Sequence, residues 1–200
     1  MKKLSSLFFI LLIIACDSSK SYNSEEEKAI EGVINSFITH YIEKKNRIPR
    51  HSKIDSALMQ RGFKPEEIKV YISDALLPIS QIFEDNKWMN SKVYQNEGLN
   101  AQFSDLYNSK TFYQLEYREF TKGKINLNTP LKQCYNCTDK ITADEQYSMI
   151  SFSRICFNEE KNMGLVVIHY GVGFEASSMS GHHGPFLIKK QNDSWSIIPK

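Results

Sequence analysis

Cys134 and Cys137 form the one C-x-x-C motif of the chain. Thiolates at this spacing can form a disulfide, lower one another's pKa or bind a metal. A thioredoxin-like site requires the first cysteine at a helix N-terminus, but residues 130–133 predict a loop, and a zinc site requires a second ligand pair that the sequence lacks. We therefore expect a structural disulfide or two loop thiols, and thiol-redox chemistry or metal binding remain the alternatives.

Three histidines form a second candidate set. His182 and His183 lie in a Gly-rich stretch, 180–184, which we expect to be a loop between two strands. His169 lies in a predicted strand, on the face opposite Val166 and Ile168. A metal bound by His169 with one or both of the other two would indicate a metal-dependent hydrolase. However, neither H-x-x-x-H nor H-E-x-x-H spacing occurs, and a loop with incidental histidines is the simpler interpretation.

The remaining motifs predict no chemistry. The glycines of Gly171–Gly173 precede a polar loop and a strand, whereas a dinucleotide fingerprint requires a following helix. No G-x-S-x-G element is present, and no Ser/His/Asp set can be assembled. We expect the basic stretch 44–53 to be a linker between helices. Contact with anionic lipid headgroups is the alternative. We thus expect no catalytic residue, no cofactor and no metal ligand.

The N-terminus has the pattern of an export signal. Lys2 and Lys3 precede an apolar run, 7–14, which ends at Ala15-Cys16. A membrane-spanning helix needs about 20 apolar residues, so this run is too short to cross a bilayer comfortably. A plain secretory signal or an uncleaved anchor are the alternatives.

Ile13-Ile14-Ala15-Cys16 resembles the lipobox of bacterial lipoproteins. The resemblance implies cleavage before Cys16, a diacylglycerol on its sulfur and attachment to a membrane of the cell envelope. Asp17 resembles an inner-membrane retention signal of enteric bacteria, a rule that does not extend to all bacteria, so the choice between inner and outer membrane stays open. We expect a signal peptide at 1–15, a lipidated tether at 16–23 and one domain at 24–200.

Composition and charge narrow the function classes. The full chain carries 25 basic and 23 acidic residues, and removal of Lys2 and Lys3 leaves 23 of each. A neutral domain has no general electrostatic reason to bind nucleic acid. With Cys16 lipidated, three cysteines remain, so one disulfide and one free thiol are expected in an oxidising compartment, and all three pairings remain open.

The first half of the chain predicts helices. Ser24 and Glu27 form a capping box, and an apolar stripe of period 3.6 follows at Ile30, Val33, Ile34, Phe37, Ile38, Tyr41 and Ile42. A shorter helix is predicted from Ser52 to Gly62, and another from Pro65 to Phe83 with a kink or break at Pro78. Residues 86–104 are predicted to be irregular. Residues 109–120 predict a further helix, whose Phe112 and Leu115 would face the core.

The second half predicts strands at 147–157, 164–174, 186–190 and 195–198, with turns at 158–162 and 191–194. Val166, Ile168, Tyr170, Val172 and Phe174 occupy one face at period two. The fold class is therefore α+β, with N-terminal helices packed on a C-terminal antiparallel meander. This element order resembles NTF2-like and cystatin-like domains, in which a long helix lies across a curved sheet.

These observations favour a membrane-anchored envelope lipoprotein with a non-catalytic binding or accessory domain. Its partners would be the membrane, through Cys16, and an envelope protein or a small-molecule ligand. We expect the ligand surface on the concave sheet face or in the Gly-rich segment 171–184. The competing hypotheses are the metal-dependent hydrolase and the thiol-redox protein.

Overall fold

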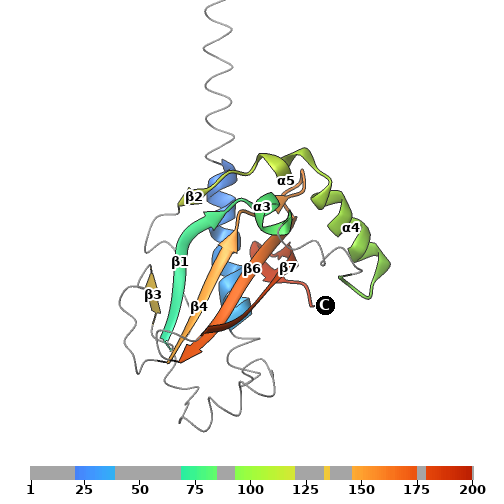
Figure 1. Cartoon of the computed structure of the whole chain (residues 1–200). Coiled ribbons are helices and arrows are strands. Elements are labelled where there is room, and N and C mark those ends of the chain that lie inside the picture. Colours follow the sequence, from blue (N-terminus) through green and yellow to red (C-terminus); the bar gives the residue numbers. More distant parts are fainter. Residues whose placement is uncertain are drawn as a thin grey trace, which may run out of the picture.

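The structure is a computed structural model that describes residues 21–38, 69–84, 93–119, 133–135, 146–174 and 179–199. An N-terminal helix (residues 21–38) lies against a curved sheet, and three short helices cover one end of the opposite face (Figure 1). This arrangement confirms the α+β class.

The sheet has eight strands in the order β2-β1-β4-β6-β7-β8, with β3 paired to β1 and β5 to β6. Its strands are β1 (Lys69–Leu77), β2 (Arg118–Glu119), β3 (Gln133–Tyr135), β4 (Gln146–Ser153), β5 (Cys156–Phe157), β6 (Met163–Phe174), β7 (Met179–Gln191) and β8 (Ser194–Ile197). The pairs β4–β6, β6–β7 and β7–β8 are antiparallel, as the predicted meander requires. β1 adds a parallel neighbour to β4, so the whole sheet is mixed.

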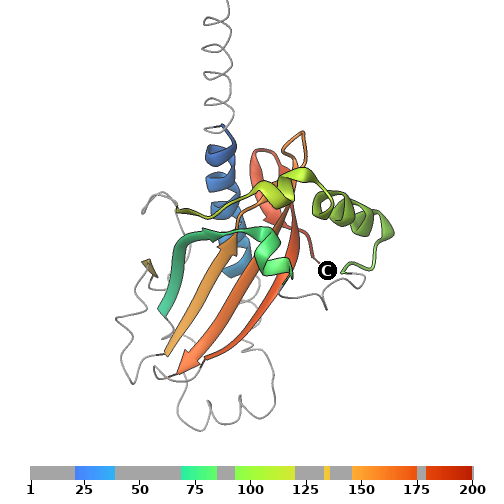
Figure 2. The same cartoon turned by 45° about the horizontal axis from the view of Figure 1, so that its top comes forward.

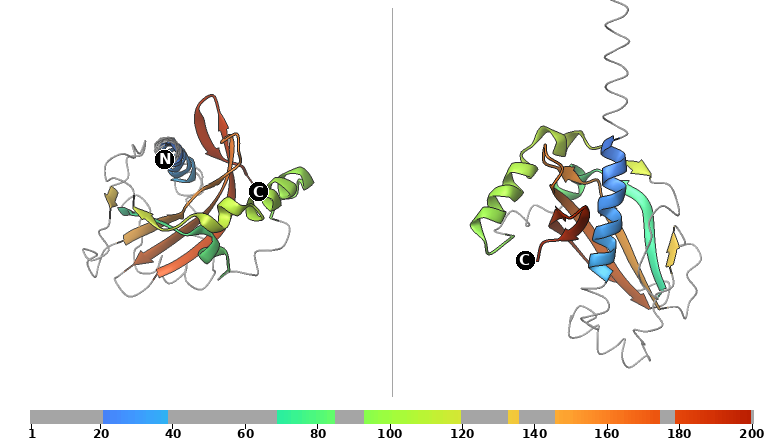
Figure 3. Two further views of the ribbon diagram at one scale, coloured as in Figure 1. Left: turned by 90° about the horizontal axis from the view of Figure 1, so that it is seen from above. Right: turned by 180° about the vertical axis from the view of Figure 1, so that it is seen from behind.

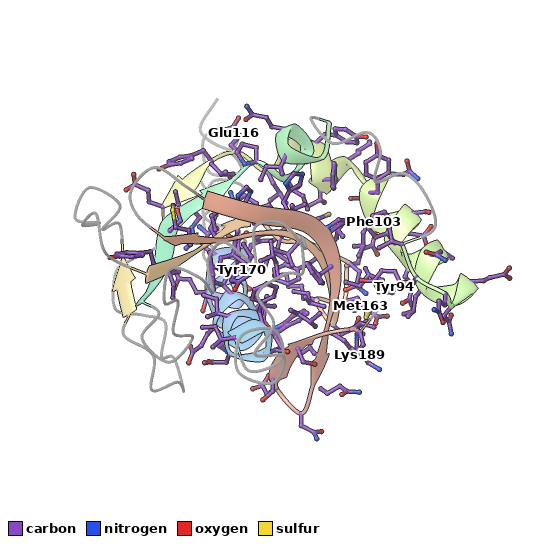
Figure 4. The ribbon with its side chains drawn as sticks, turned by 60° about the horizontal axis from the view of Figure 1, so that its bottom comes forward. Tyr94, Phe103, Glu116, Met163, Tyr170 and Lys189 are labelled. Atoms are coloured by element: carbon purple, nitrogen blue, oxygen red, sulfur yellow. The ribbon has the colours of Figure 1, made fainter. Side chains whose placement is uncertain are left out.

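The N-terminal helix lies along one face of the sheet, as Figure 3 shows from behind, and its apolar stripe is buried there. The predicted stripe is confirmed for Ile30, Val33, Ile34, Phe37 and Ile38, all of which are buried. They pack against Val166 and Ile168 of β6 and their neighbours on β1, β4 and β7. The ring of Tyr170 lies 5.4 Å from that of Phe37, between this helix and the sheet (Figure 4). Tyr41 and Ile42 lie outside the described residues.

The opposite face is covered at one end by α3 (Ile79–Glu84), α4 (Glu97–Tyr107) and α5 (Lys110–Gln114), which Figure 2 shows from a second angle. Leu165 and Val167 of β6 face these helices and pack with Phe103, Phe112 and Leu187. β6 thus alternates between two cores, which is why four consecutive residues of this strand are apolar and buried.

The prediction of a helix from Pro65 to Phe83 is wrong for residues 69–77, which form β1, whereas residues 79–83 are helical as predicted and belong to α3. Val70, Tyr71 and Ile72 are β-branched or aromatic residues that favour a strand, and they pair in parallel with Ser148, Met149 and Ile150 of β4. A partner so distant in the sequence leaves no local signal. Pro78, the predicted site of a kink or break in that helix, marks the boundary between β1 and α3 and not a break within one helix.

Three further boundaries differ from the predictions. The N-terminal helix includes Ser21, so Ser24 is not its cap and Ser21–Asn23 do not belong to a tether. Residues 97–104, predicted as irregular, belong to α4, which Asn96 caps by accepting from the amide of Leu99 at 3.2 Å. The predicted helix at 109–120 is only α5, although Phe112 and Leu115 are buried as expected. The predicted helix 52–62 lies outside the described residues.

The two predicted hairpin turns are confirmed. Asn192 and Asp193 both adopt positive φ, at 47° and 63°, between β7 and β8, as a tight two-residue hairpin requires. In the turn at 158–162, the side chain of Asn158 accepts from the amides of Asn162 and Met163. These turns hold the register of β5 and β6 and of β7 and β8.

Candidate functional site

An open cleft of about 640 Å³ lies where the N-terminal helix, the segment through α5 to β2, the β4–β5 connection and the 158–162 turn meet. Its lining includes Tyr22, Tyr117, Arg118, Arg154 and Lys161. Glu116, which also lines the cleft, lies on the α5–β2 side of the domain (Figure 4). The lining of the cleft thus combines three cations and two tyrosines with an acidic residue, Glu116.

Glu26 holds the side chains of Arg118 and Arg154, which line the cleft, in position. Its carboxylate is fully buried, at 0% exposure, and accepts from Arg154 Nε at 2.8 and 3.0 Å and from the amide of Ile155 at 2.9 Å. Arg118 Nη1 donates to the same carboxylate at 2.8 Å. A buried charge is stable only when paired and hydrogen-bonded in this way. Glu26 thus fixes two arginines from segments distant in sequence.

Arg118 and Arg154 are each held by a second contact. Arg118 Nη2 donates to Glu27 Oε1 at 2.5 Å, and Arg154 Nη1 donates to the carbonyl of Glu116 at 2.8 Å. Both guanidinium groups are therefore largely neutralised and held in position, which suits a rigid wall better than a free anion receptor.

Tyr22 belongs to the N-terminal helix and also lines the cleft. Its hydroxyl donates to the carbonyl of Ile155, and its ring packs edge-on against Phe157 with centroids 5.3 Å apart. Burial and the nearby Glu26 carboxylate raise the pKa of this hydroxyl well above its ordinary value. Tyr22 is therefore a neutral donor and not a base.

Lys161 is the cation of the cleft most available to a ligand. Its ammonium donates to Ser21 Oγ at 3.4 Å and lies 5.7 Å from the Tyr22 ring centroid, a distance that allows a cation–π contact. No carboxylate of the described residues forms an ion pair with it. The residues that line the cleft include no histidine or cysteine, so the arrangement supports binding of a polar ligand more directly than nucleophilic or metal chemistry.

The predicted histidine set is brought together only in part. His169 and His183 are direct partners between β6 and β7, and their rings stack with centroids 5.6 Å apart. His182 takes the register position opposite Tyr170 instead. The prediction of a loop at 180–184 is wrong, because these residues belong to β7. Within the described parts of the chain, no group of three His, Cys, Asp or Glu side chains could hold a metal.

The cysteines are only partly described. Cys134 lies in β3, opposite Tyr71 of β1, and not in the predicted loop. Cys137 and Cys16 lie outside the described residues. Cys156 is a free thiol, buried at 0% exposure, with its sulfur 3.3 Å from Ser109 Oγ. Burial raises its pKa, although the contact with Ser109 works against this shift.

Sequence reasoning missed the cleft. Glu26 belongs to no sequence motif, yet its buried carboxylate pairs with Arg154 and Arg118. One signal could have indicated the site: Arg154 interrupts an apolar stretch that includes Phe152, Ile155 and Phe157. A charge inside buried sequence predicts a buried partner.

Comparisons with family models, curated proteins and solved structures gave no match. The described helices include none that is long and apolar enough to span a membrane.

Proposed function

We propose that the chain is a lipid-anchored envelope protein whose domain binds a ligand without catalysing its reaction. The observation that carries this proposal is the basic and apolar leader ending at Ala15-Cys16. The cysteine is followed almost at once by folded structure, because the helix already includes Ser21. Five residues at full extension reach about 18 Å, so an acylated Cys16 would hold the domain close to the bilayer.

The cleft is the proposed ligand site. It is open, it lies beside the first turns of the helix, and it combines the Tyr22 and Tyr117 rings with the ammonium of Lys161. Polar and charged residues make up most of its lining, and the two tyrosine rings add flat apolar surface. The ligand would therefore carry a polar or anionic group next to a flat apolar part. An envelope protein that presents such a side chain would fit equally well.

The metal-dependent hydrolase has one supporting observation, the stacked pair of His169 and His183. A catalytic zinc site uses three protein ligands, and His182 occupies a different register position. The thiol-redox hypothesis for Cys134 and Cys137 stays a prediction, because Cys137 and the side chain of Cys134 are not described. We therefore favour binding over both alternatives.

Metabolic labelling with a fatty-acid probe tests the anchor. The parent chain should incorporate the label and fractionate with membranes, whereas Cys16→Ala should lose both properties. Cys137→Ala is the matched control, because it removes a cysteine outside the lipobox and should label like the parent. Equal labelling and membrane fractionation of Cys16→Ala and the parent would contradict the proposal.

A further inference from the structure

The large hydrophobic side chains exposed in the described structure gather at one end of the domain. They are Leu77, Tyr113 and Tyr117, at 39%, 54% and 53% exposure. Leu77 ends β1, and pairing of Leu76 with Arg118 brings it beside Tyr117 at the start of β2. Tyr113 lies in α5 between Thr111 and Gln114, two residues that line the cleft. We call these three side chains the aromatic rim.

The aromatic rim lies at the end of the domain from which the chain leads back to Cys16. Tyr22 and Asn23 line the same cleft as Tyr117, and α5 and β2 lie beside the start of the N-terminal helix in Figures 1 and 3. The 18 helical residues extend about 25 Å along the helix axis, which exceeds the reach of about 18 Å from Cys16 to Ser21. A short tether of this kind favours contact of the rim end, and not the far end, with a bilayer.

We propose that the aromatic rim is the face by which the domain docks on the phospholipid bilayer that holds its anchor. This inference rests on the proposed lipidation of Cys16. Tyrosine is suited to the membrane interface, since its ring is apolar and its hydroxyl remains hydrated. Leu77 adds an aliphatic side chain to the same face. Docking in this orientation places the mouth of the cleft at the headgroup layer.

Electrostatic attraction to anionic lipid contributes little to this docking. Lys161 and Arg118 lie at the rim end, but Glu27 pairs with Arg118, and the carboxylates of Glu116 and Glu119 are exposed nearby. The near balance of charge implies that insertion of aromatic side chains, and not attraction to anionic lipid, supplies the contact. The domain should therefore dock on zwitterionic vesicles, with little dependence on salt.

Tryptophan reporters test the orientation. The full acylated chain is reconstituted on the surface of phosphatidylcholine vesicles that carry bromine on the upper acyl chain, which quenches nearby indole fluorescence. Tyr113→Trp and Tyr117→Trp place a reporter in the rim, and Gln102→Trp, at an exposed position of α4, is the control. The parent chain provides the background of Trp88 and Trp195.

We expect the fluorescence added by either rim reporter to be quenched and shifted to shorter wavelength. The fluorescence added by the Gln102→Trp control should be neither quenched nor shifted. Circular dichroism checks that each variant is folded, and two independent rim positions keep the test valid if one substitution unfolds the domain. Equal quenching of rim and control in an acylated chain would overturn the docking face alone. A purified chain whose mass lacks the acyl groups would instead contradict the proposed function and, with it, the docking.

Discussion

Glu26 of the N-terminal helix and Arg154 of the β4–β5 connection form a buried ion pair, with both carboxylate oxygens within 3.0 Å of Arg154 Nε. The pair joins the helix to the sheet at the end where the cleft lies. It also orients the wall of the cleft, because Arg154 reaches the carbonyl of Glu116 with its Nη1. The stability of the domain and the shape of its candidate site therefore depend on the same contact.

Glu26→Gln should destabilise the domain by about 3 to 5 kcal/mol, because it leaves the buried Arg154 guanidinium without its counter-charge. The introduced amide would also direct a donor at Arg154, Arg118 or the amide of Ile155. Urea denaturation followed by circular dichroism measures the change.

Glu25→Gln is the matched control for this prediction. Glu25 also pairs with a cation and accepts from Trp195 Nε1 at 2.8 Å, but neither Glu25 nor its partner Lys190 is fully buried. A glutamine can still accept from the indole, so we expect a much smaller loss. Similar losses for the two variants would show that the burial of Glu26 is not what makes its pair important.

Gly32→Ala should destabilise the domain by about 1 to 3 kcal/mol through overpacking. A Cβ at this position would collide with the carbonyl oxygen of Trp195 and lie 2.9 Å from its Cβ. Because one of these atoms belongs to the backbone of β8, the N-terminal helix would have to move away from the sheet. Thermal unfolding of the purified variant measures the effect.

Gly98→Ala, in the first turn of α4, is the control for Gly32→Ala. A Cβ there lies 3.1 Å from the side-chain oxygen of Asn96 and touches no backbone of another element. Alanine also favours the helix over glycine by roughly 1 kcal/mol. A loss at Gly98 as large as that at Gly32 would contradict the close approach of helix and sheet as the cause.

The sequence predicts those parts of the fold that depend on local pattern. The apolar stripe from Ile30 to Ile38, the alternation in β6 and the turn at Asn192-Asp193 are each expressed in neighbouring residues, and the structure confirms them. β1 and α4 were missed for different reasons. β1 depends on pairing with β4, more than 70 residues away, and α4 mixes polar and apolar residues and buries only Phe103 and Leu106.

The candidate site could not be predicted in the same way. The cleft depends on Tyr22, Arg118, Arg154 and Lys161, which come from four separate segments. Their juxtaposition follows from the sheet register and from the burial of Glu26, neither of which leaves a motif. By contrast, the placement of His169 on the face opposite Val166 and Ile168 follows from strand alternation alone, and the structure confirms it.

Cys156 should resist alkylation in the folded protein and react once the domain is unfolded. The thiol is fully buried between Ser109 and the carbonyl of Leu106, and burial raises its pKa above the ordinary value of 9.0. The unfolded chain therefore ionises first, and the stability contributed by this group is lost as pH rises above 9.0 toward the higher folded value. Iodoacetamide labelling with and without urea, followed by peptide mass mapping, distinguishes Cys156 from the other cysteines. Rapid labelling of the folded chain at Cys156 would contradict its burial.

His169 should titrate below its ordinary value of 6.5, because partial burial and the charge of neighbouring His183 both lower its pKa. As pH falls, the unfolded chain takes up the proton first, so the stability contributed by this group is present above 6.5 and is lost as pH falls through the lower folded value. Proton–carbon NMR of the imidazole, assigned with His169→Gln, gives the midpoint. His183→Gln removes the neighbouring charge and should raise that midpoint toward 6.5 without restoring it fully, since burial remains. A midpoint at or above 6.5 in the parent, or one unmoved by His183→Gln, would show that the stacked rings do not interact electrostatically.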